Sequence, residues 1–191
     1  MRTFVAIEVP QEIRERMREL LLSLQRSALD LRWSRPEGLH ITVKFLGEVS
    51  AEQLEAVKSN LQMVAAPAPF SIDIRGAGFF PNERAPQVLW LGIQAGPELG
   101  ELAAAVENQL LPIGFKKEDR PFAPHLTLAR TKSSSQLSGL RELLRTREPL
   151  EMGSFTAREF FLYESQMSRG GSIYHKIARF PLASTPPSAS L

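Results

Sequence analysis

The pattern His-x-Thr-apolar, with an apolar residue at x, occurs twice in this chain and constrains its fold more than any other feature. It begins at His40 and again at His125, which are two of only three histidines in the sequence. In a β-strand, side chains two positions apart lie on the same face. His40 and Thr42 are therefore expected to share one face of a strand, and so are His125 and Thr127. The pattern predicts two strands that each present an imidazole and a hydroxyl to a common cleft, with apolar residues buried behind them.

Elements of similar kind and order surround the two motifs, which lie 85 residues apart. Apolar residues at three- and four-residue spacing indicate helices, and alternating or β-branched runs indicate strands. Ser50 followed by Gln53 predicts a capping box at the start of one helix. Helices are predicted at residues 11–29, 50–64, 97–111 and 133–144, and strands at 2–9, 32–34, 39–46, 70–74, 88–93, near 115, 125–130, 154–163 and 173–180.

The predicted order of elements favours the α+β class over a doubly wound parallel sheet, because helices are mixed with antiparallel hairpins. Each half follows the order helix, turn, motif strand, helix and paired strands. We expect residues 1–182 to form a single domain with two lobes. Residues 183–191 are rich in Pro and Ser and are predicted to be a disordered tail.

Composition excludes several classes of function. The chain has no cysteine, which rules out disulfides, thiolate zinc sites and a cysteine nucleophile. A net charge of +2 does not indicate bulk nucleic-acid binding, although it allows a local basic cleft. No apolar stretch approaches the roughly 18 residues of a membrane span, and Glu8 interrupts the apolar run at the start. We therefore expect a cytoplasmic protein with no membrane partner.

Two histidines facing one cleft are suited to in-line displacement at phosphorus. One imidazole takes a proton from the attacking oxygen and the other donates a proton to the leaving oxygen, and both forms of imidazole coexist near neutral pH. The hydroxyls of Thr42 and Thr127 are positioned to bind the non-bridging phosphate oxygens. This scheme needs no metal or cofactor, and no carboxylate or third histidine lies at ligand spacing beside either motif. A serine hydrolase is disfavoured because the Gly-x-Ser-x-Gly turn is missing.

The chain resembles the two-histidine phosphoesterase superfamily and, within it, the RNA 2′,3′-cyclic phosphodiesterases once called 2′-5′ RNA ligases. The resemblance spans nearly the whole chain and leaves out only the tail. It rests on residues 2–7, Trp33, residues 40–48, residues 124–130, Leu162, Ser165, Gly171 and Tyr174.

This resemblance implies a bilobal fold with a pseudo-two-fold axis, outer helices and a central cleft lined by the motif strands. It implies that His40 is the general acid and His125 the general base. The implied reaction opens a 2′,3′-cyclic phosphate at an RNA 3′ end, or on a nucleotide, and leaves a 2′-phosphate. Some members of the family also join RNA ends through a 2′-5′ linkage. We expect a monomer. A relative that binds nucleotides or RNA ends without catalysis is the alternative, which the intact His and Thr residues of both motifs disfavour.

The fifth residue after each histidine is Phe45 in the first motif and Arg130 in the second. A pseudo-two-fold axis would make them partners that sandwich a nucleobase, and Arg130 could also reach the phosphate. Strict alternation places both on the core face, so this hypothesis needs a bulge or a strand end in each repeat. A core position for Phe45 is the competing interpretation.

Several other residues near the motifs have weaker signals. Lys44 is predicted on the face of His40 and Thr42, either adding positive charge near the phosphate or as an ordinary solvated lysine. The third histidine, His175, lacks a motif and is predicted to be structural. Trp33 and Tyr174 are predicted to pack, and Ser165 has no assigned role.

Overall fold

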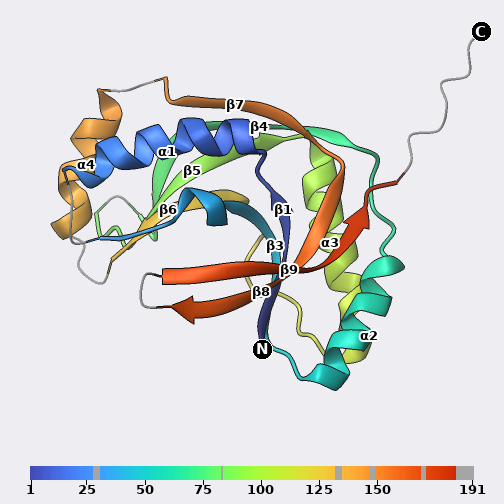
Figure 1. Cartoon of the computed structure of the whole chain (residues 1–191). Helices are drawn as coiled ribbons and strands as arrows, with labels where there is room; N and C mark the ends of the chain where they lie inside the picture. Colours follow the sequence, from blue (N-terminus) through green and yellow to red (C-terminus); the bar gives the residue numbers. More distant parts are fainter. Residues whose placement is uncertain (28–30, 83, 132–134, 147–148, 169–170, 184–191) are drawn as a thin grey trace, which may run out of the picture.

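The computed structural model describes residues 1–27, 31–82, 84–131, 135–146, 149–168 and 171–183, and it contains two antiparallel β-sheets (Figure 1). The first sheet has the order β3-β1-β8-β9 and consists of β3 (His40–Glu48), β1 (Arg2–Glu8), β8 (Glu159–Ser168) and β9 (Gly171–Pro181). The second has the order β2-β6-β5-β4-β7 and consists of β2 (Arg32–Trp33), β6 (His125–Arg130), β5 (Val88–Ala95), β4 (Phe70–Phe80) and β7 (Glu151–Ala157).

In the described part of the chain, four α-helices and two single-turn 3₁₀ helices accompany the sheets. They are α1 (Gln11–Gln25), α2 (Ala51–Gln62), α3 (Pro97–Leu110), α4 (Ser135–Arg145), η1 (Pro36–Gly38) and η2 (Leu111–Ile113). The capping box predicted for α2 is present: Ser50 Oγ accepts from the Gln53 amide, and the Gln53 side chain accepts from the Ser50 amide. The combination of these helices with two antiparallel sheets confirms the predicted α+β class. No helix in the described ranges is long and apolar enough to cross a membrane.

The two sheets repeat one arrangement of strands. In the first sheet the motif strand β3 pairs with β1, which pairs with β8 and then β9. In the second sheet the motif strand β6 pairs with β5, which pairs with β4 and then β7. The duplicated antiparallel sheets predicted from the two motifs are therefore present, and β2 is an addition to the second sheet outside its motif strand.

The chain departs from the predicted elements at four places. The helix predicted over residues 11–29 ends at Gln25 as α1, and Arg26 and Ser27 form a turn. The segment predicted as one strand over residues 154–163 is two strands, because the chain leaves the second sheet after Ala157 and enters the first at Glu159. The predicted strand 70–74 continues to Phe80 through a register shift that includes Gly76, whose φ of 73° lies in the left-handed region that favours glycine. Residue 115 is not in a strand. The predicted tail lies outside the described residues except for Ala183.

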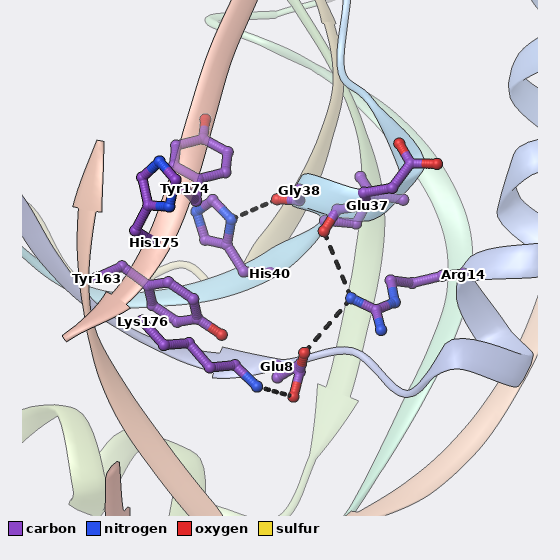
Figure 2. Close-up of a pocket in the computed structure, with 10 residues that line it drawn as sticks. Glu8, Arg14, Glu37, Gly38, His40, Tyr163, Tyr174, His175 and Lys176 are labelled. Carbon is purple, nitrogen blue, oxygen red and sulfur yellow. Dashed lines mark hydrogen bonds and ion pairs between the residues drawn. The ribbon is translucent and has the colours of Figure 1, made fainter. Parts of the chain in front are cut away.

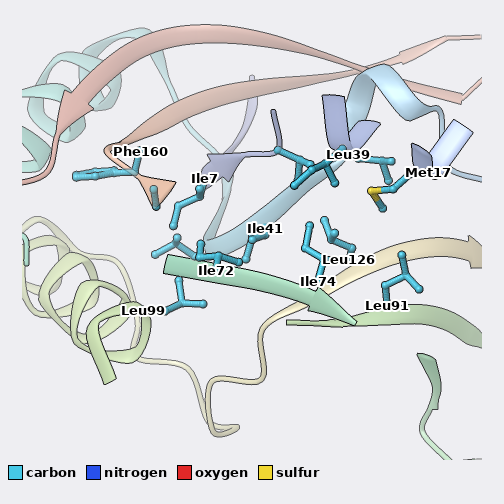
Figure 3. Close-up of a cluster of buried hydrophobic side chains, with 14 of the residues drawn as sticks. Ile7, Met17, Leu39, Ile41, Ile72, Ile74, Leu91, Leu99, Leu126 and Phe160 are labelled. Atoms are coloured by element: carbon cyan, nitrogen blue, oxygen red, sulfur yellow. The ribbon is translucent and has the colours of Figure 1, made fainter. Parts of the chain in front are cut away.

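One hydrophobic core takes side chains from both sheets (Figure 3). Ile7 and Ile41 come from the first sheet, and Ile72 and Leu126 come from the second; all four are at most 1% exposed. The predicted apolar positions of the motifs are confirmed, since the residues between and after His and Thr in each motif are buried. A smaller cluster lies apart from this core and consists of Phe4, Ala6, Phe161, Tyr163 and, partly buried, Tyr174. The core therefore fixes one face of each motif strand and leaves the alternate positions for the site.

Candidate active site

The two motif histidines occupy equivalent positions, each as the first residue of its strand. Nδ1 of His40 lies 2.6 Å from the carbonyl oxygen of Gly38, and Nδ1 of His125 lies 2.8 Å from that of Ala123. A carbonyl oxygen can only accept a hydrogen bond, so each Nδ1 carries the proton and donates it. Nε2 is therefore the nitrogen that exchanges protons in both rings. The His-x-Thr pattern gave no indication of these carbonyl contacts.

The ring of His40 is enclosed by aromatic side chains. Its centroid lies 4.5 Å from that of Phe4 and 4.8 Å from that of Tyr174, which meets it edge-on. Burial lowers the pKa of His40 from its ordinary 6.5 to about 4, the carbonyl of Gly38 opposes this shift, and the charge of His125 adds to it. The charge of His125 acts on His40, so the two imidazoles lie within electrostatic reach of each other. His40 is therefore neutral in the free protein near neutral pH.

His125 has a similar edge-on neighbour but a more open setting. Phe80 of β4 lies 4.9 Å from its ring at an interplanar angle of 80°. Tyr174 and Phe80 thus each meet a motif histidine edge-on. Tyr174 was predicted to pack, which is confirmed, whereas the role of Phe80 had no signal in the sequence.

The two motif threonines are half-buried beside the histidines. Thr42 lies opposite Ala6 in the first sheet, and Thr127 lies opposite Trp90 in the second. The hydroxyl of Thr127 accepts a hydrogen bond of 3.4 Å from Nη2 of Arg130. This contact joins two of the predicted site residues, and both share the six-residue strand β6 with His125.

A β-bulge interrupts each motif strand at the third position after the histidine. Between β1 and β3 the register passes from Ala6–Thr42 to Val5–Lys44, which leaves Val43 as the extra residue. Between β5 and β6 the register shifts in the same way and leaves Leu128 as the extra residue. A bulge reverses the alternation of the residues that follow it.

The bulges place Phe45 and Arg130 outside the core, as the base-sandwich hypothesis requires. The side chain of Phe45 is 56% exposed, so its competing interpretation as a core residue is wrong. Arg130 is exposed as well. Phe45 keeps one aromatic neighbour, Phe4, at 6.1 Å between ring centroids.

The prediction that Lys44 shares the face of His40 and Thr42, which assumed strict alternation, is wrong. The bulge turns its side chain away from the face of His40 and Thr42, and only 4% of the residue is exposed. Its ammonium donates to Oε1 of Glu107 on α3 and to the carbonyl of Lys116, both at 3.0 Å. Burial opposes ionisation of Glu107, but the amide of Glu118 and the ammonium of Lys44 together lower the pKa of its carboxyl. Lys44 therefore fastens the segment after α3 and is neither a phosphate contact nor a solvated lysine.

The remaining candidates lie at the margin of the site. Trp33 packs against the main core, as predicted. Ser165 pairs with Arg2 and Tyr174 through the backbone ladder. His175 is exposed. No group of three or more His, Asp or Glu side chains among the described residues is arranged to hold a metal ion.

Two pockets lie beside the loops that lead into the motif strands. One of about 330 Å³ borders His40 and is polar (Figure 2). Its walls are Glu8, Arg14, Glu37, Gly38, Leu39, His40, Tyr163, Tyr174, His175 and Lys176. The other, of about 530 Å³, is bordered by Phe122 and Pro124, which precede His125, and by residues around the start of α3. Sequence reasoning found neither pocket, because the walls come from segments far apart in the chain.

Comparisons with known proteins agree with this duplicated arrangement. The sequence model of the family described as LigT like phosphoesterase matches the chain twice, over residues 7–90 and 91–174, so each match contains one motif. The RNA 2′,3′-cyclic phosphodiesterase of Archaeoglobus fulgidus is 35% identical over 180 residues, which cover 94% of this chain and 99% of that protein. The protein of the same name from Escherichia coli is 32% identical over 185 residues, covering 95% and 96%.

Solved structures give the same result. A crystal structure described as that of a phosphoesterase superposes with a TM-score of 0.78 at 32% identity, covering 96% of this chain and 98% of the other. Escherichia coli LigT in complex with 3′-AMP superposes with a TM-score of 0.72 at 28% identity, with the same coverage. Because the family match extends over both motifs and both sheets, this chain belongs to the LigT like phosphoesterases, a family of two-histidine enzymes.

Proposed function

We propose that this chain hydrolyses RNA 2′,3′-cyclic phosphate ends to 2′-phosphate ends by acid–base catalysis with two histidines and without a metal ion. The observation that carries the proposal is the matched pair of imidazoles, each held through Nδ1 by the carbonyl two residues back. The relatives named RNA 2′,3′-cyclic phosphodiesterase support the substrate class, which comprises RNA 3′ ends and nucleotides with a 2′,3′-cyclic phosphate.

In the proposed reaction, water attacks phosphorus in line with the bond to the 3′ oxygen. Nε2 of His125 takes a proton from the water as the new bond to phosphorus forms. The bond to the 3′ oxygen breaks, and Nε2–H of His40 donates its proton to that oxygen, which becomes the 3′-hydroxyl. The phosphate stays on the 2′ oxygen, and exchange with solvent returns each histidine to its starting form.

The other motif residues bind the substrate in this scheme. Thr42, Thr127 and Arg130 donate hydrogen bonds to the non-bridging phosphate oxygens, where charge increases in the transition state. Phe45 and Arg130 stack on the two faces of the terminal base. The exposure of both side chains supports this role, because neither is occupied by core packing.

His40 can act as the general acid only if substrate binding gives it a proton. Burial lowers its pKa to about 4 in the free protein, so a general acid at this position must gain its proton in the complex. An anionic phosphodiester beside the ring favours the charged imidazolium and raises this pKa.

The low pKa of His40 also favours a second assignment, with His40 as base and His125 as acid. A substrate with sulfur in place of the leaving 3′ oxygen separates the two assignments, because a thiolate leaves without protonation. We expect His40→Ala to lose far less activity on the sulfur substrate than on the oxygen substrate, while His125→Ala loses equally on both. The opposite result would exchange the roles.

The reaction itself is tested with an oligonucleotide that ends in a 2′,3′-cyclic phosphate, incubated with the protein and a chelator. We expect a product with a 2′-phosphate, identified by ³¹P NMR, and no turnover by the double variant His40→Ala/His125→Ala. A 3′-phosphate product, or loss of activity on chelation, contradicts the proposal. Replacing water by an RNA 5′-hydroxyl would give a 2′-5′ linkage, and adding such an acceptor to the same assay tests for ligation.

A further inference from the structure

The polar pocket beside His40 contains two cationic side chains that the proposed chemistry does not use. Arg14 comes from α1 and Lys176 from β9, and both point into the pocket (Figure 2). They share one carboxylate: Nζ of Lys176 lies 2.6 Å from Oε2 of Glu8, and Nη1 of Arg14 lies 3.4 Å from Oε1. The other acidic wall residue, Glu37, turns its carboxylate away from the pocket and pairs with Arg18 at 2.5 Å.

The pocket is therefore electropositive, with two cations facing a single carboxylate. An ammonium has three donors and a guanidinium has five, so pairing with Glu8 leaves both groups able to bind a further anion. Tyr163 adds a hydroxyl, and burial, reinforced by the charge of Glu8, raises the pKa of this group so that it stays a donor. The donors suit a phosphate group, whose oxygens accept hydrogen bonds from several sides.

The duplicated architecture does not require these charges. Eighty-five residues after Arg14 and Glu37, the equivalent positions are occupied by Leu99 and Phe122. Both of these residues line the larger pocket beside the loop into His125. Among the described residues, no charged side chain lines that larger pocket, so the cationic character is specific to the pocket beside His40.

The direction of the displacement indicates which part of the substrate lies beside His40. In-line displacement puts the attacking and leaving oxygens on opposite sides of phosphorus. The leaving 3′ oxygen belongs to the ribose, and His40 donates to it, so the ribose and the RNA chain that precedes it lie on the His40 side. His40 is itself part of the pocket wall, so the pocket adjoins the place where the ribose is held.

We propose that this pocket binds the phosphodiester group on the 5′ side of the terminal nucleotide, through Lys176 and Arg14, so that the preferred substrate is an RNA chain of at least two nucleotides. This inference rests on the proposed function and on His40 as the general acid.

The test compares adenosine 2′,3′-cyclic phosphate with the dinucleotide ApA that ends in the same cyclic phosphate. We expect the wild-type protein to have a higher kcat/KM for the dinucleotide. In Lys176→Met, the ratio of dinucleotide to mononucleotide kcat/KM should fall roughly tenfold, the usual effect of losing one charge-assisted hydrogen bond. Arg14→Gln should lower the same ratio, and Glu8→Gln should preserve or raise it because it releases both cations.

Two controls test whether the effect depends on the charge of the phosphate and on this particular lysine. A dinucleotide with an uncharged methylphosphonate linkage should lose the preference in the wild-type protein, and Lys176→Met should reduce its turnover no further. Lys58→Met removes a half-buried lysine on α2 that pairs with Glu55 and lies outside this pocket, and it should keep the wild-type ratio. An unchanged ratio in both Lys176→Met and Arg14→Gln, or an equal preference for the methylphosphonate, overturns the inference. Turnover of neither nucleotide by the wild-type protein would instead overturn the proposed function, and this inference with it.

Discussion

The surroundings of His40 and of His125 share a backbone arrangement and differ in almost every side chain beyond the motif. Both histidines begin a strand, both contact the carbonyl two residues back, and both are followed by a bulge at the third position. The fourth position is Lys44 in one half and Ala129 in the other, and the fifth is Phe45 or Arg130. Backbone geometry therefore holds the matched histidines in place, whereas the positions that follow each bulge can take unlike roles.

The setting of the imidazoles differs as well. His40 lies among Phe4, Tyr163 and Tyr174, whereas His125 has Phe80 as its ring neighbour. Burial is the largest cause of the low pKa of His40. An enzyme that needs one acid and one base gains from such inequality, because two identical imidazoles would titrate together.

The largest expected effect is the loss of either histidine. His40→Ala and His125→Ala should each lower kcat by about 10²–10⁴, the usual contribution of a placed proton donor or acceptor. Steady-state kinetics measures the loss, and the melting temperature confirms that each variant is folded. Near wild-type activity in either folded variant would show that the two halves do not share the reaction.

Lys44 tests a buried ion pair at a position where the second motif has Ala129. Lys44→Met should lower the free energy of unfolding by about 3 kcal/mol, since it leaves the Glu107 carboxylate without its buried partner. Urea unfolding measures this change. The double variant Lys44→Met/Glu107→Met should recover much of the loss because it removes both charges; a double variant as unstable as the single one would contradict the ion-pair explanation.

Phe45 and Arg130 test whether equivalent positions hold opposite faces of one base. Phe45→Ala should weaken nucleotide binding by roughly 1–3 kcal/mol and leave kcat nearly unchanged, because stacking acts equally on the ground and transition states. Arg130→Ala should lower kcat as well, since its guanidinium also reaches the phosphate. Titration calorimetry and kinetics separate these effects, and a large drop in the melting temperature of Phe45→Ala with unchanged affinity would return Phe45 to a packing role.

The pH dependence of kcat/KM tests the low pKa of His40. The pH profile of kcat/KM, which reports the free protein, should have an acidic limb at about pH 4, because His40 takes up its proton there. Tyr174→Ala, which opens the His40 ring to water, should move this limb towards 6.5. A wild-type limb already near 6.5 would mean that burial does not shift His40.

The lowered pKa of His40 also predicts a pH effect on the stability of the fold, smaller than the effects above. In the unfolded chain His40 binds a proton near pH 6.5, but in the folded protein it does so only near pH 4. The unfolded state therefore gains protons first, and the folded protein loses stability as pH falls from about 6.5 to about 4. The melting temperature of His40→Gln should fall less than that of the wild-type protein across this range; parallel curves would contradict the prediction.

Local periodicity in the sequence was sufficient to predict several features of the fold. The alternation around Ile41 and Leu126 indicated which face of each motif strand is buried, and Ser50 with Gln53 marked the start of α2. The repeated motif also indicated a duplicated α+β fold. These features follow from side chains a few positions apart in one segment, so they can be read from it directly.

Features that depend on pairing between distant segments could be seen only in the folded protein. A bulge is a count of two residues against one on a neighbouring strand, so the position of Val43 relative to β1 cannot be read from the motif strand alone. That bulge buries Lys44 and exposes Phe45, reversing what alternation predicts for each. The pocket beside His40 is likewise assembled from α1, β1, β8 and β9, whose residues come from opposite ends of the chain. Chain order carries no information on these contacts, because they form only when the sheets pack.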